Sequence, residues 1–243
     1  MKRSERQHLK ENELTHVFAE AGQTLAERQR TFGTIGAIVL VLAVIAGGYW
    51  AWQTRNETRA QMIMLEAQTV VQSPVQATKP DASGKVAQAP GSYPTINARA
   101  EAALEKFMQA ANEYPSTNAG IAARYYAASA LSMLGRYPDA AMRYQEVADR
   151  AGASSFYGRM ARLGAVESLV QAKQYDQAIA KAQALADAND ELLPRDAMLM
   201  ELGRAYAAAG KKTEAKQTFD QVLKEFPESA FADEAKGLLA SVT

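Results

Sequence analysis

The chain contains no cysteine. This absence excludes structural disulfides, thiolate metal sites, a cysteine nucleophile and the lipidated cysteine of lipoproteins. Histidine is almost as scarce, because His8 and His16 are the only two and both precede residue 31. Residues 53–243 therefore lack the commonest general base and the commonest metal ligand, so catalysis there would depend on carboxylate, lysine or serine chemistry.

The carboxylates that could support such chemistry occur at the ordinary density of helix surfaces and form no distinctive pair. The sequence shows no glycine-rich phosphate loop. Asp187, Asp190 and Glu191 could suggest a cation site, but we interpret them as an acidic loop between helices. We therefore predict that the protein is not an enzyme and has no catalytic residue, cofactor or metal site. The other carboxylates considered are Glu105, Glu113, Glu146, Glu167, Glu201 and Glu225.

The sequence also lacks an excess of either charge, with 27 Lys and Arg against 27 Asp and Glu. No global electrostatic field therefore attracts nucleic acid. We predict that the partners are membrane lipid and other proteins, which must be recognised locally.

One segment lacks charge entirely, from residue 31 to residue 54. A helix of this length spans about 36 Å at about 1.5 Å per residue, which is enough to cross a hydrocarbon core of about 30 Å. Aromatic residues that suit the headgroup region lie at both ends of the segment. We therefore predict a transmembrane helix over 31–54. The alternative is a cleaved signal peptide, because Ala46 and Gly48 are small residues of the kind found at cleavage sites. The charged region of such a signal peptide would, however, be about 30 residues long, which is unusual. The aromatic residues are Phe32, Tyr49, Trp50 and Trp52.

Residues 1–30 are predicted to form an amphipathic helical tail. Ser4 and Gln7 fit a capping box, and an apolar stripe from Leu14 to Leu25 follows one helical face. The stripe could lie on the membrane, dock a cytoplasmic partner or belong to a solvated helix. The basic residues of the tail favour a cytoplasmic N-terminus, although next to the membrane the two sides carry equal numbers. These basic residues are Lys2, Arg3, Arg6, Lys10, Arg28 and Arg30.

Two segments separate the apolar helix from the rest of the chain. Residues 55–72 are predicted to continue as a helix, with a packing face formed by Met62, Leu65 and Thr69 and flanked by Ile63, Glu66 and Val70. Residues 73–94 hold four of the eight prolines and show no apolar periodicity, so we predict a flexible linker.

Residues 95–243 repeat one pattern. Its anchors Ala103, Ala140, Ala178 and Ala215 are spaced by 37, 38 and 37 residues. The residues four and seven positions after each anchor lie on the same helical face as the anchor, and twelve positions after it comes a turn former. Five residues before the last three anchors, Gly135, Lys173 and Gly210 suit the end of a preceding helix.

Each repeat is therefore predicted to be a helical hairpin, and the fold class is all-α, with one transmembrane helix followed by an α-solenoid. The first helices of the later hairpins are expected at 121–134, 158–172 and 196–209. The first hairpin is expected to be split, with its second helix at 96–113 and residues 55–72 as its first. A last helix over 230–240 is expected to cap the array.

This pattern resembles the tetratricopeptide repeat, whose period is about 34 residues. The last copy matches best, and the extra three or four residues per copy correspond to about one helical turn. The copies at Ala140 and Ala178 match less well, with Ala128 and Val166 in place of the family's glycine. The matching residues of the last copy are Leu202, Gly203, Tyr206, Ala215, Phe219 and Pro227.

The order of segments resembles that of bacterial single-pass membrane proteins whose tetratricopeptide domain associates with the Sec translocon and with periplasmic chaperones. The resemblance implies an inner-membrane protein with a periplasmic repeat domain that serves as an accessory of protein translocation or chaperone recruitment. The stretch "KEFPESAFADEAKGLL" also resembles repeats of outer-membrane-assembly lipoproteins and cell-envelope coordinators. The alternative function is accordingly a structural scaffold or oligomer-forming subunit of another envelope complex.

The expected protein-binding groove lies on the first helices of the hairpins. Its apolar stripe, which includes methionine and tyrosine, suits recognition of extended or partly unfolded segments, and Glu167 and Arg204 could fix a peptide's polar backbone. Alternatively, residues 55–72 or the linker cover the stripe. The predicted groove residues are Ala122, Tyr125, Met160, Leu163, Glu167, Ala197, Met200 and Arg204.

Overall fold

A computed structural model describes residues 3–80, 86–152, 154–188 and 192–242, with the backbone alone at 3–33, 79–80 and 86–87. The chain divides into two compact units, Met1–Arg55 and Asn56–Thr243. Helix α1 (Arg3–Gln72) begins in the first unit and ends in the second.

The first unit is helical throughout its described part. From Thr34 onward α1 is long and apolar enough to cross a membrane, with a mean hydropathy of 2.0 in its most apolar window. Its apolar side chains are exposed, as Leu40 and Val44 are at 65% and 67%. The predicted tail is helical from Arg3, but its side chains, including His8 and His16, lie outside those that are described.

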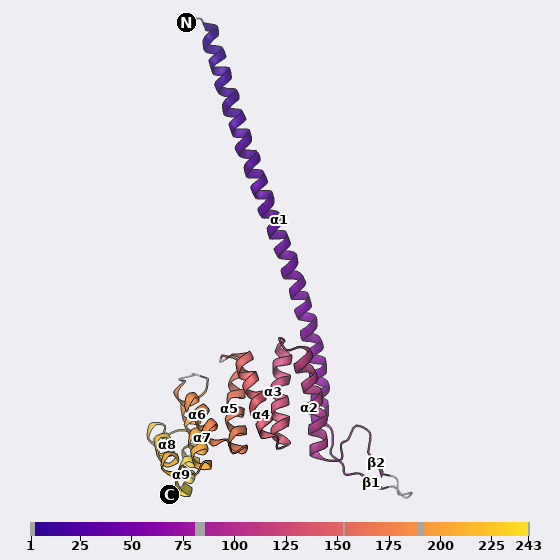
Figure 1. The fold of residues 1–243 in the computed structure, drawn as a ribbon, viewed down its shortest axis with the longest axis vertical. Helices are drawn as coiled ribbons and strands as arrows, with labels where there is room; N and C mark the ends of the chain where they lie inside the picture. The colour runs from indigo at the N-terminus through magenta and orange to yellow at the C-terminus, as the bar shows by residue number, and fades with distance from the viewer. Residues whose placement is uncertain (1–2, 81–85, 153, 189–191, 243) are drawn as a thin grey trace. The chain divides into compact units, whose positions relative to one another are not determined.

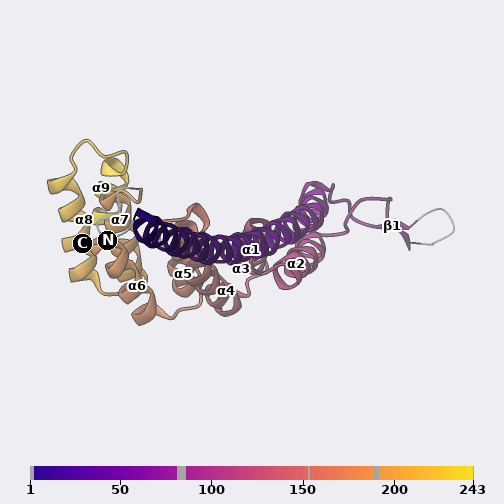
Figure 2. The ribbon, with the colours of Figure 1, turned by 90° about the horizontal axis from the view of Figure 1, so that it is seen from above.

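The second unit is a solenoid of successive helix pairs, which confirms the predicted fold class. Each helix packs against the next one along the chain. Figure 1 labels these helices, and Figure 2 shows them as a curved row from α2 to α9. The helices are α2 (Ile96–Glu113), α3 (Asn118–Met133), α4 (Tyr137–Ala151), α5 (Phe156–Gln171), α6 (Tyr175–Asp187), α7 (Arg195–Ala208), α8 (Lys212–Glu225) and α9 (Ala232–Val242).

The repeat register is confirmed by burial. Each anchor alanine is at most 1% exposed. The residues four and seven positions later are buried as well, because the second helix of each hairpin turns this face inward. The buried residues at these two positions are Phe107, Ala110, Tyr144, Val147, Ala182, Leu185, Phe219 and Val222.

The three residues that were predicted to end the first helices, five positions before the later anchors, all adopt the left-handed conformation. Gly135 and Gly210 both have φ 73°, and Lys173 has φ 59°. At each site the next residue donates its backbone N–H to a carbonyl five residues earlier, as Gln174 does to Leu169 at 2.9 Å. This pattern is a Schellman motif, which stops the first helix and lets the chain reverse.

Glycine permits a close helix approach in the last hairpin. A Cβ on Gly203 would lie 2.5 Å from the ring of Phe219, so only glycine fits against this aromatic side chain. Gly164 plays the same part against Tyr144, where a Cβ would lie 2.7 Å from the ring. The tyrosine that follows one anchor thus packs on the first helix of the next hairpin.

The first hairpin is formed by the end of α1 and by α2. The centre of the predicted packing face of residues 55–72 is wrong, since Met62 and Leu65 are 62% and 64% exposed, whereas the flanking Ile63 and Val70 pack partly against the core. Ala60 and Ala67 are fully buried instead. Four apolar residues in a row, from Met62 to Leu65, leave the apolar pattern without a preferred face, and the small alanines decide the contact by allowing close packing.

The proline-rich segment is better ordered at its ends than the prediction of a flexible linker implied. Backbone hydrogen bonds join Tyr93 N to Pro74 O at 3.0 Å and Gln76 N to Tyr93 O at 2.9 Å. Further on, β1 (Lys79–Pro80) pairs with β2 (Val86–Ala87) in antiparallel orientation. The sequence missed these contacts because they join residues that carry no apolar periodicity.

Candidate groove face of the repeat domain

Three first helices, α3, α5 and α7, carry the predicted groove residues. Side-chain caps start two of them, since Thr117 and Ser155 accept hydrogen bonds from Gly120 N and Gly158 N, both at 2.9 Å. We call the side of these helices that carries Tyr125, Leu163 and Arg204 the groove face.

An aromatic cluster dominates the groove face at α3. The ring of Tyr125 lies 5.5 Å from those of Tyr126 and Tyr144 and 5.6 Å from that of Tyr157. Burial raises the pKa of Tyr125, Tyr144 and Tyr157 above the ordinary tyrosine value. Tyr125 and Tyr157 remain partly accessible and offer a partner both ring area and a hydroxyl.

The middle of the groove face is apolar and half-buried. Met160 and Leu163 of α5 pack partly against the core, as does Ala197 of α7. Each therefore keeps some surface that a partner can reach.

Two predicted groove residues have almost no surface. Met200 is 0% and Ala122 4% exposed, so neither can touch a partner in this structure. Met200 belongs to the same core cluster as Phe219, with Leu238 and Leu239 of α9 packed against that cluster. The expectation that Met200 lines an open groove is therefore wrong, because its side chain lies within this core cluster.

The charged residues of the groove face differ in availability. Arg204 forms ion pairs with Glu201 of its own helix and with Glu234 of α9. Burial raises the pKa of the Glu201 carboxyl, and Arg204 opposes this shift. Glu167 is exposed, and no cation of the described residues lies within ion-pair distance of it. A partner's donor can therefore pair with Glu167, whereas Arg204 already has two carboxylates.

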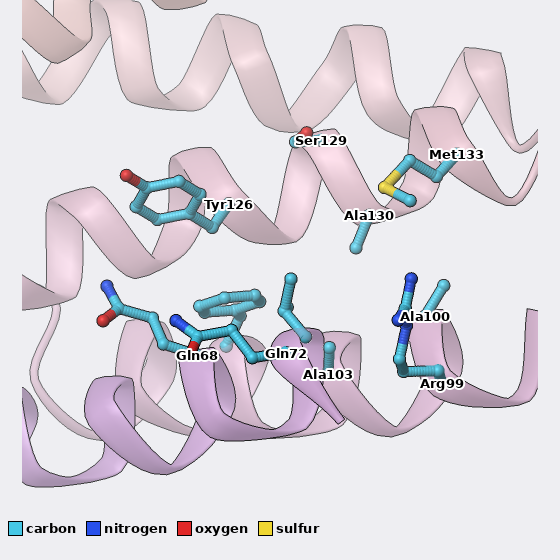
Figure 3. A pocket seen from close by; sticks show the side chains of 11 residues that line it. Gln68, Gln72, Arg99, Ala100, Ala103, Tyr126, Ser129, Ala130 and Met133 are labelled. Atoms are coloured by element: carbon cyan, nitrogen blue, oxygen red, sulfur yellow. The ribbon is translucent and has the colours of Figure 1, made fainter. Parts of the chain in front are cut away.

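A cavity of about 300 Å³ lies between the end of α1, α2 and α3, and the sequence did not predict it. Figure 3 shows Tyr126, Ser129 and Met133 of α3 across the cavity from the glutamines of α1. The available signal was the spacing of Ser129 and Met133, which follow Tyr125 at intervals of four on the same helical face. The lining residues are Gln68, Val71, Gln72, Arg99, Ala100, Ala103, Phe107, Tyr126, Ser129, Ala130 and Met133.

The prediction that the acidic loop before α7 holds no cation concerns residues that the structure describes only in part. Asp190 and Glu191 lie outside the described residues. Within the described part of the chain, no group of three or more His, Asp or Glu side chains could hold a metal ion.

Comparison with known proteins gives a family match. A model described as a tetratricopeptide repeat matches residues 196–229, which cover α7 from its second residue, the turn after it and α8. No curated protein matches the chain significantly. The matched copy is the one whose residues best fit the repeat pattern, and with the solenoid of helix pairs it shows that the repeat domain is similar to tetratricopeptide repeats.

Proposed function

We propose that the protein is a membrane-anchored interaction module that binds other proteins on the groove face of its repeat domain. The observation that carries this proposal is the accessible surface of Tyr125, Tyr157 and Leu163 beside the unpaired Glu167. Tetratricopeptide repeats generally bind other proteins, and extended concave surfaces are the usual binding sites of solenoids.

The proposed anchor is the apolar part of α1, residues 31–54. Its exposed apolar side chains find a suitable environment in a bilayer core. With the basic tail in the cytoplasm, residues 55–243 lie in the periplasm of a bacterium, attached to the inner membrane. Single cysteines at Ser4→Cys and Thr78→Cys test this orientation, because the chain has no cysteine of its own. In right-side-out vesicles an impermeant thiol reagent should label only the second variant, and labelling of only the first would contradict the topology.

The partners we propose are Sec translocon subunits or periplasmic chaperones. A membrane-attached domain that binds extended apolar segments would hold such partners near emerging polypeptides. A photo-crosslinking residue at Leu163, on the groove face, should capture one of them from intact membranes. The same residue at Lys216, exposed on α8, is the control. Equal capture from both positions, or none from Leu163, would contradict the proposal.

One observation favours the alternative of an oligomer-forming scaffold. Met62 and Leu65 place two large apolar side chains on the exposed side of the first hairpin, where no preceding repeat covers them. Two copies in one membrane could pair through this surface. Leu65→Cys should then give a disulfide-linked dimer on mild oxidation, whereas Lys216→Cys should not.

A further inference from the structure

The cavity between α1, α2 and α3 is large enough to hold one large side chain and part of the chain beside it. Its volume of about 300 Å³ lies at the lower end of the range of about 300–1,000 Å³ that is usual for small-molecule sites. Small side chains create the space, since Ala100, Ala103 and Ala130 line it. Phe107 and Tyr126 stack on each other with ring centroids 5.4 Å apart and give the cavity an aromatic wall.

Two glutamines supply polar groups beside this apolar space. Gln68 and Gln72 lie one turn apart on α1, about 6 Å along the helix axis. In an extended peptide, main-chain groups that point to the same side recur every two residues, a spacing of about 6.6 Å. An amide both donates and accepts hydrogen bonds, so this pair suits the main chain of an extended segment.

A single cation completes the lining. Arg99 donates from Nη1 to the carbonyl of Ser73 at 3.0 Å, and no carboxylate of the described residues lies within ion-pair distance of its guanidinium. The lining contains no acidic residue. The cavity is thus complementary to an acidic group on whatever occupies it.

We infer that this cavity binds a large apolar side chain of an extended polypeptide segment, with an acidic residue of that segment next to Arg99. The inference rests on the proposed function, because it assigns a ligand class to the same binding module. The cavity then favours segments that carry a large apolar residue beside an acidic one, whereas the aromatic and aliphatic side chains of the groove face bind polypeptide segments without strong sequence preference.

Fluorescence anisotropy of the full-length protein in detergent tests the inference. The probe is a fluorescein-labelled peptide, Gly-Ser-Gly-Ser-Phe-Asp-Ser-Gly-Ser, and the matched probe has alanine in place of phenylalanine. We expect the phenylalanine peptide to bind at least about tenfold more tightly. Equal affinities, or binding of neither peptide, would overturn the inference.

Two variants test the location. Ala130→Leu fills the cavity, and Met133→Trp covers it from an exposed position; each should lower affinity for the phenylalanine peptide about tenfold. Met142→Trp changes a similarly exposed methionine on α4 and should leave affinity unchanged. Arg99→Gln should lessen the preference for the phenylalanine peptide over a version of it in which Ser replaces the Asp that follows the phenylalanine. If Ala130→Leu unfolds by circular dichroism, Met133→Trp decides the question; unchanged affinity in a folded variant overturns the site.

Crosslinking from Leu163 separates this inference from the proposed function. If capture from Leu163 persists while peptide affinity ignores the cavity variants, the groove binds proteins and only the cavity assignment is wrong. If capture from Leu163 is absent, the proposed function itself is wrong.

Discussion

The first and last hairpins follow the same repeat rules but end in different surfaces. In the last hairpin, Met200 is fully buried and Arg204 is paired with α9. In the first, the end of α1, α2 and the neighbouring α3 leave a cavity of about 300 Å³ next to Arg99, whose guanidinium has no carboxylate of the described residues within ion-pair distance. The repeat pattern thus fixes the contact between the two helices of a hairpin, whereas neighbouring segments decide how much of the remaining surface of the hairpin is covered.

The largest expected difference concerns the aromatic residues four positions after the anchors. Phe219→Ala should lower the free energy of unfolding by about 3–5 kcal/mol, because a fully buried ring is lost from a closed core. Phe107→Ala should cost less, since the ring of Phe107 already borders empty space. Thermal melting of the full chain in detergent, monitored by circular dichroism, measures the loss of stability in both variants. Equal losses would show that the first hairpin is packed as tightly as the last.

The next prediction tests how the first hairpin is joined to the second. The Glu57 carboxylate accepts hydrogen bonds from Asn118 N at 2.8 Å and Ala119 N at 2.9 Å, so it caps α3 from a distant part of the chain. Glu57→Ala should cost about 0.5–2 kcal/mol, as loss of a cap does. It should also speed hydrogen exchange at these two amides. Glu105→Ala, an exposed glutamate on α2, is the control and should change neither quantity.

A smaller effect is expected at the turns. Lys173 holds a left-handed conformation that costs a non-glycine residue about 1–2 kcal/mol. Lys173→Gly should therefore raise the unfolding free energy by up to about 1 kcal/mol, after the greater flexibility of glycine in the unfolded chain is deducted. Gly210→Lys should lower it by a similar amount. A loss of stability in Lys173→Gly would mean that the lysine side chain supports the turn.

The smallest effect concerns pH at the closed end. Burial raises the pKa of Glu201, so the folded protein binds a proton there more tightly than the unfolded chain does. The unfolding free energy should fall as pH rises from the ordinary glutamate pKa through the raised one. Glu201→Gln removes this contribution, so its melting midpoint should decline less over that pH interval. Parallel profiles for the two proteins would contradict the shift.

Much of the second unit could be predicted from sequence because its pattern is local. Anchor alanines, the residues four positions later and the turn formers all lie within one hairpin. The bounds of α2 were predicted as Ile96–Glu113, as observed. Even Lys173, which is a poor residue for its turn, was placed by its offset from the neighbouring anchors.

What could not be predicted depends on contacts between segments far apart in the chain. Ala60 and Ala67 are the fully buried residues of 55–72, and the four consecutive apolar residues from Met62 to Leu65 conceal this choice of face in the sequence. Met200 belongs to a core cluster to which distant residues such as Leu238 and Leu239 of α9 add their side chains, and the cavity depends on how far α1 stands from α3. Offsets within one repeat contain no information about such distances.

The paired ends of the proline-rich segment make that segment a natural insertion site. Because Pro74 and Tyr93 are already hydrogen-bonded, the helices on either side are joined at a fixed point whatever lies between. Lengthening a loop whose ends are held costs only about 0.6 kcal/mol for each doubling of its length. An epitope tag or a small folded domain could therefore be carried between residues 77 and 92 while α1 and α2 remain a hairpin.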